Sequence, residues 1–123
     1  MARLKRYGIV ASLLGAGLLF SACGTGSAIA DARTSCRFVH QALVLQARSE
    51  APGMSAASRN ALENQALSEL LKGTPAAARA TSSDGSWNPL MTTINEAERV
   101  PLADLVASLT RLCQVANSSS PYL

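Results

Sequence analysis

Four side chains in this sequence stand out for their reactivity: the cysteines Cys23, Cys36 and Cys113, and the single histidine, His40. A cysteine can carry a lipid, form a disulfide, bind a metal or act as a nucleophile, and a histidine can act as a base or a metal ligand. The chemistry of each residue depends on its sequence context. Cys23 has the most informative one.

Cys23 ends an N-terminal segment with the features of an export signal. Basic residues open the chain, an uncharged run covers residues 7–20, and no acidic residue occurs before Asp31. A basic start, a short apolar stretch and small residues at its end are typical of a secretory signal peptide. The run is shorter than the ~20 residues of a permanent transmembrane helix. The sequence therefore predicts a signal peptide.

Residues 19–23, Leu-Phe-Ser-Ala-Cys, resemble the bacterial lipobox, in which a hydrophobic and two small residues precede a cysteine. The resemblance implies that residues 1–22 are removed and that Cys23 carries a diacylglycerol anchor. Two or three acyl chains, at ~0.8 kcal/mol per buried methylene, hold a protein firmly on a membrane. The alternative is ordinary cleavage after Ala30, which would release a soluble protein. Residues 24–30, which are small and glycine-containing, are expected to form a flexible spacer.

Export would place Cys36 and Cys113 in an oxidising compartment, where paired cysteines usually form disulfides. With Cys23 assigned to the lipid, these two cysteines and His40 fall short of the roughly four ligands of structural zinc. A redox-active pair would more often have Cys-x-x-Cys spacing, which is absent. We therefore predict a Cys36–Cys113 disulfide, and we expect neither a metal nor a cofactor.

Helices are the elements that must position these residues. Ala, Leu, Glu, Gln and Arg fill the segments between Gly and Pro breaks, and no strand-like alternation is present. The expected helices cover residues 31–49, 55–72, 75–80, 86–99 and 101–116. A bridge from Cys36 to Cys113 would set the first and last helices side by side and antiparallel. We predict an all-α, up-and-down bundle of about four main helices over residues 31–117, clamped by that disulfide, with a flexible tail at 118–123.

The most distinctive turn in the chain contains its only tryptophan, Trp87, between Asp84-Gly-Ser and Asn88-Pro. We interpret it first as a capped turn whose indole fills the bundle core. The alternative is a groove for a ligand or partner, lined by Trp87, Asn88 and Met91.

No catalytic residue is predicted. The sequence has neither a Gly-x-Ser-x-Gly elbow nor a nucleotide-binding glycine loop. The neighbouring acids Glu96 and Glu98 are two residues apart, so their carboxylates diverge on a helix. A small enzyme or accessory subunit with a site near His40 stays open as an alternative, as does a purely structural spacer.

The net charge of +3 comes entirely from Arg3, Lys5 and Arg6, so the rest of the chain is formally neutral. We find no basic stripe along any expected helix, and aromatic residues for base stacking are scarce. Nucleic acid is therefore not an expected partner.

The lipobox at Cys23, Cys36 in the first helix, the turn ending at Trp87 and Cys113 in the last helix together resemble small secreted lipoproteins of actinobacteria. Those families imply no activity, so no functional residue is carried over. We expect a non-enzymatic helical module on the extracytoplasmic face of the cell membrane. It would be held there by the lipid on Cys23 and would bind a partner protein or envelope component.

Overall fold

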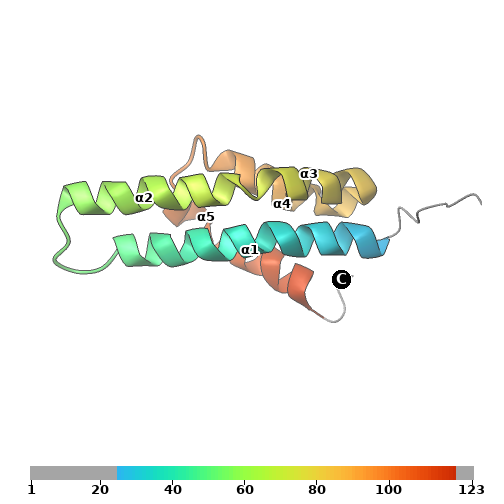
Figure 1. The fold of residues 1–123 in the computed structure, drawn as a ribbon, viewed down its shortest axis with the longest axis horizontal. Coiled ribbons are helices and arrows are strands. Elements are labelled where there is room, and N and C mark those ends of the chain that lie inside the picture. Colours follow the sequence, from blue (N-terminus) through green and yellow to red (C-terminus); the bar gives the residue numbers. More distant parts are fainter. Residues whose placement is uncertain (1–24, 119–123) are drawn as a thin grey trace, which may run out of the picture.

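The structure, a computed structural model, describes residues 25–118, which form five α-helices and one short 3₁₀ helix without a strand (Figure 1). The all-α fold class is confirmed. The predicted signal peptide over residues 1–22, Cys23 and residues 119–123 of the predicted tail lie outside the described residues. The elements are α1 Thr25–Ser49, α2 Ala56–Leu71, α3 Thr74–Ser83, η1 Gly85–Trp87, α4 Asn88–Glu96 and α5 Leu102–Asn117.

The long helix α1 is the element on which most of the others pack. Its 25 residues correspond to a length of about 37 Å. Figure 1 shows α2 and α3 following one another along α1, both running opposite to it. Only Lys72 and Gly73 separate α2 from α3, and the Gly73 N–H donates to the Leu70 carbonyl over 2.9 Å. The short alanine-rich helix was thus predicted correctly in place, although it is longer than expected and continues the direction of α2.

Small side chains allow α1 and α3 to lie close together. Ala28 and Ala32 of α1 are fully buried, as are Ala77 and Ala80 of α3. Alanine loses no side-chain entropy on burial and lets helix backbones approach. Alanines that looked like generic helix formers in the sequence are therefore core residues.

The structure differs from the prediction at the start of α1. Residues 24–30 were expected to form a flexible spacer, but α1 already begins at Thr25 and Ala28 is 0% exposed. Partly buried Ile29 packs on the same core. Tertiary packing has overridden the weak helix propensity of this glycine-containing segment.

The turn between α3 and α4 is capped by Asp84. Its Oδ1 accepts a hydrogen bond from the Ser86 N–H over 2.9 Å, as an Asp cap before a helix does. This hydrogen bond holds the pKa of the Asp84 carboxyl below its ordinary value, because it stabilises the charged form. The cap directs the chain into η1 and places Trp87 at the core.

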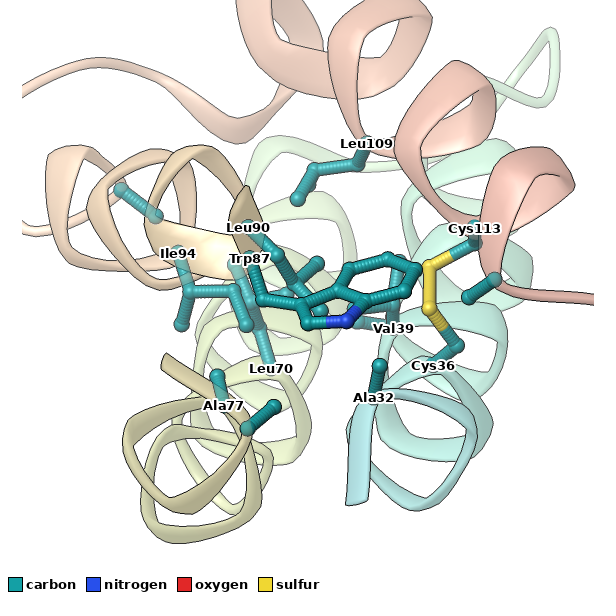
Figure 2. Packing of buried hydrophobic residues seen from close by; sticks show 14 of the residues in the cluster. Ala32, Cys36, Val39, Leu70, Ala77, Trp87, Leu90, Ile94, Leu109 and Cys113 are labelled. Atoms are coloured by element: carbon teal, nitrogen blue, oxygen red, sulfur yellow. A yellow bond between two sulfur atoms is a disulfide. The ribbon is translucent and has the colours of Figure 1, made fainter. Parts of the chain in front are cut away.

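The disulfide predicted between Cys36 and Cys113 is present, with a Cα–Cα separation of 5.5 Å. It joins the middle of α1 to the C-terminal part of α5, so the first and last helices are clamped side by side. The Trp87 indole points from η1 toward this bridge, with Val39 and Leu90 in the same buried cluster (Figure 2). The inner side of the disulfide therefore faces the Trp87 indole and the aliphatic core.

Candidate binding groove between the first and last helices

A groove with a volume of about 580 Å³ runs between α1 and α5 on the outer side of the disulfide. Its size falls within the range of small-molecule sites in proteins. Both helices contribute to it because the disulfide fixes their separation. The lining residues are Arg33, Cys36, Arg37, Val39, His40, Gln41, Leu43, Thr110, Cys113, Gln114 and Asn117.

The floor of the groove is apolar and rigid. Cys36 and Cys113 are 4% and 9% exposed, so the disulfide presents only a narrow strip to the groove. Val39 is buried beside it, and Leu43 is half-buried against the core. A ligand in the groove would thus rest on sulfur and aliphatic side chains.

Arg33 is held in place at one end of the groove. Its Nε donates to the carbonyl of Ala116 over 2.7 Å, and its Nη2 donates to the carbonyl of Ser118 over 3.3 Å. These contacts satisfy carbonyls in the last turn of α5 and put a positive charge at the negative end of that helix. These two hydrogen bonds therefore hold the Arg33 guanidinium at the end of α5, although the residue is exposed.

Arg37 lies one helical turn further along the same exposed face of α1. Its Nη2 donates to Thr34 Oγ1 over 3.2 Å, and a guanidinium has five N–H donors in total. No acidic residue lines the groove. The remaining N–H donors of Arg37 therefore have no carboxylate partner among the residues that line the groove.

His40 is exposed at the rim of the groove. Within residues 25–118 no Asp, Glu or Ser side chain forms a hydrogen bond with it. General-base chemistry needs a base oriented by a partner within hydrogen-bonding reach. His40 therefore places an exposed imidazole at the rim of the groove.

The prediction that no helix carries a basic stripe was wrong. Arg33, Arg37, His40 and Arg48 are spaced by four, three and eight residues, and all four are exposed on α1. Those spacings place them on one face of a helix. These spacings can be read from the sequence. They were overlooked because the chain after its first residues has no net charge.

Some basic residues outside this face of α1 form ion pairs with acids. Lys72 pairs with Glu69, and Arg79 of α3 pairs with Asp31 of α1 over 3.1 Å. Such exposed pairs contribute little to stability, but they cancel charge locally. Arg59 of α2 and Arg111 of α5 form no ion pair among the described residues, but each stands apart from the arginines of α1 in the sequence.

A second, shallower hollow of about 390 Å³ adjoins the groove and shares His40 and Gln41 with it. Val44, Leu45 and Glu69 complete its lining, and Val44 is 45% exposed. The two hollows meet at His40 and Gln41, and we call them together the track. Arg33 and Arg37 line the first hollow, and Val44 and Leu45 line the second.

The turn agrees with its first interpretation, a capped turn with a core indole, and the three residues of the alternative groove do not line the α1/α5 groove. Trp87 is only 6% exposed, so its indole is a core group, whereas Asn88 is exposed and Met91 is half-buried against the core. The groove between α1 and α5 was not predicted, because its lining depends on which faces of two helices far apart in the sequence pack together. In the sequence, only the predicted disulfide indicated that these two helices are neighbours.

Within the described part of the chain, His, Cys, Asp and Glu side chains do not gather in groups of three or more that could hold a metal ion. None of the helices in residues 25–118 combines the length and apolar character needed to cross a membrane. The site is thus defined by its concave shape, its charge and its disulfide floor.

Comparisons with known proteins give no further guide to function. A scan against protein-family models finds no match, and neither curated proteins nor solved structures match this chain. The function therefore has to be argued from the residues themselves.

Proposed function

We propose that this chain is a lipid-anchored, non-enzymatic binding module on the extracytoplasmic face of a cell membrane, and that the α1/α5 groove is its binding surface. One observation carries the proposal: the groove is built on a closed disulfide, Cys36–Cys113. Structural disulfides persist in oxidising compartments, which supports export. The same bridge preorganises the groove, and a preformed site loses less entropy when it binds.

The start of α1 determines how the bundle would sit on the membrane. Thr25 begins the helix, so only Gly24 separates it from the lipidated Cys23 of the proposal. A tether that short would keep the bundle at the bilayer surface, with the N-terminal end of α1 nearest the lipid. The module would therefore act on ligands at or near the membrane.

The alternative of an enzyme near His40 has less support. The imidazole is exposed and has no acid or serine partner within residues 25–118. A binding role needs only the groove, whereas catalysis needs an oriented base and a nucleophile or substrate-activating group.

The anchor is tested by Cys23→Ser, with Ser27→Ala as a control that leaves every cysteine intact. We expect Cys23→Ser to lose acylation and to change membrane retention on cell fractionation, while Ser27→Ala behaves as the wild type. Unchanged retention of Cys23→Ser would remove the anchor from the proposal.

The binding role is tested by crosslinking on intact cells. A photo-crosslinking amino acid at Gln114, on the groove, is compared with the same amino acid at Gln65, an exposed glutamine of α2 outside the groove. We expect discrete adducts from position 114 and none of them from position 65. Identical adduct patterns from both positions would refute the groove as the binding surface.

A further inference from the structure

We infer that the α1/α5 groove binds a single-chain anionic amphiphile, with its carboxylate or phosphate on Arg37 and its apolar chain directed toward Val44. This inference rests on the proposed function, because it takes the groove as the binding surface. It adds the chemical class of the ligand and the residues that recognise each end.

The charge of the groove selects an anion. Two arginines, Arg33 and Arg37, line it one helical turn apart, and no acidic residue lines it. A guanidinium binds a carboxylate or phosphate through two parallel N–H donors. Arg33 already uses two donors on the carbonyls of Ala116 and Ser118, so its charge adds to the field while Arg37 offers the free donors.

The apolar part of the track selects a chain attached to that anion. From Arg37 to Val44 the helix rises roughly 10 Å, at ~1.5 Å per residue. Along this distance the lining changes from guanidinium to the aliphatic side chain of Val44, with Leu43 in the α1/α5 groove and Leu45 in the adjoining hollow on either side of it. Among residues 25–118, Val44 is the one large hydrophobic side chain that is exposed, with 45% of its surface accessible. A medium-length acyl chain would cover it.

The polar rim fits an elongated ligand with one charged end. Thr110, Gln114 and Asn117 of α5 line the groove opposite α1, and Asn117 follows the Ala116 carbonyl that binds Arg33, so neutral donors are available for further oxygen atoms of a carboxylate or phosphate. The one acid in the track, Glu69, lies at the far end and is paired with Lys72. An acidic peptide would place several negative charges along the track, including near Glu69, so the amphiphile is the better match.

The experiment uses the mature, acylated protein in nanodiscs of phosphatidylcholine, titrated with octyl phosphate. Emission of Trp87, the only tryptophan, reports binding because its indole points toward the disulfide on the groove floor (Figure 2). Empty nanodiscs correct for partition of the probe into lipid. Inorganic phosphate, uncharged octyl glucoside and a polyglutamate peptide are the comparison probes.

We expect saturable binding of octyl phosphate that is stronger than binding of any comparison probe. Arg37→Gln should weaken it about tenfold, the effect of losing one charge-assisted interaction. Arg59→Gln, which removes an exposed arginine of α2 outside the groove, should leave it unchanged. Val44→Ser should weaken octyl phosphate several-fold but leave the shorter butyl phosphate nearly unaffected, because only the longer chain reaches it.

Three results would overturn the inference: equal affinity in Arg37→Gln and wild type, equal affinity for octyl glucoside and octyl phosphate, or tighter binding of polyglutamate. The outcome is separable from that of the proposed function. If crosslinks at Gln114 persist while octyl phosphate fails to bind, the ligand class is wrong and the binding role stands.

Discussion

The backbone of α1 lies very near Gly73, between α2 and α3, and replacing Gly73 with alanine tests the packing there. A Cβ atom at Gly73 would lie 3.0 Å from Ser35 Oγ, 3.1 Å from the Ser35 carbonyl oxygen and 3.2 Å from the Leu70 carbonyl oxygen. Ser35 is fully buried and its Oγ donates to the Gly73 carbonyl over 2.9 Å. The added methyl group would therefore press directly on the α1 backbone.

Two effects compete in Gly73→Ala. The backbone of Gly73 is helical, with φ −78° and ψ −13°, so alanine fits without strain and gains about 0.4–1 kcal/mol by restricting the unfolded chain. Overpacking a core costs about 1–3 kcal/mol, and here two of the three contacts are backbone oxygens that cannot rotate away. We expect a net loss of about 1 kcal/mol in the free energy of unfolding, from the difference of these terms.

Urea unfolding followed by circular dichroism measures the change, which corresponds to a midpoint lowered by about 1 M at a slope of ~1 kcal/mol per M. Gly85→Ala is the matched control, because nothing lies within 4 Å of its added Cβ and its φ is not positive. That control should be neutral or slightly stabilising. If Gly73→Ala stabilises the protein as much as Gly85→Ala does, the close approach of α1 to Gly73 is wrong.

Three further predictions concern the clamp, the core and the turn. Replacing both Cys36 and Cys113 with serine should lower the free energy of unfolding by about 4 kcal/mol, because the bridge closes a loop with a sequence separation of 77; an unchanged thermal midpoint would contradict the clamp. Trp87→Ala should cost about 3–5 kcal/mol in urea unfolding, since the indole is a buried core group; a loss below about 1 kcal/mol, the size of an ordinary surface change, would place the indole outside the core. The Asp84 pKa is lowered in the folded state, so its contribution to stability is present above the ordinary aspartate pKa and disappears as the pH falls through the lowered value. Asp84→Asn should flatten this acid dependence, and an NMR titration that gives Asp84 an ordinary or raised pKa would contradict the cap.

Much of the fold could be predicted from the sequence because its helices are amphipathic or bounded by clear signals. The stripe from Leu102 to Ala116 predicted α5 to within a residue at each end. A serine is a favoured N-cap, and at the start of α2 the Oγ of Ser55 accepts from the Ser58 N–H. These features are local, so they can be read from neighbouring residues alone.

The start of α1 could not be predicted in the same way. Residues 24–30 look like a spacer by composition, and only burial of Ala28 beside the alanines of α3 explains their helical form. Helix stability in proteins comes mainly from tertiary packing, which local propensity does not contain.

The groove was predictable in part. The Cys36–Cys113 pairing indicated that the first and last helices meet, but not which side chains flank the meeting. The spacing of Arg33 and Arg37 was a usable signal of a basic face, and an overall neutral charge concealed it. The first interpretation of the turn, an indole that fills the core, agrees with the burial of Trp87, which leaves the alternative of a groove around it without support.

The central claim, a binding module held on a membrane by its own N-terminus, is tested most directly by intact-mass and peptide mass spectrometry of the mature protein from the membrane fraction. Our account predicts that the first residue is Cys23 and that it carries a diacylglycerol group. A mature protein that starts at Asp31 without lipid would contradict it.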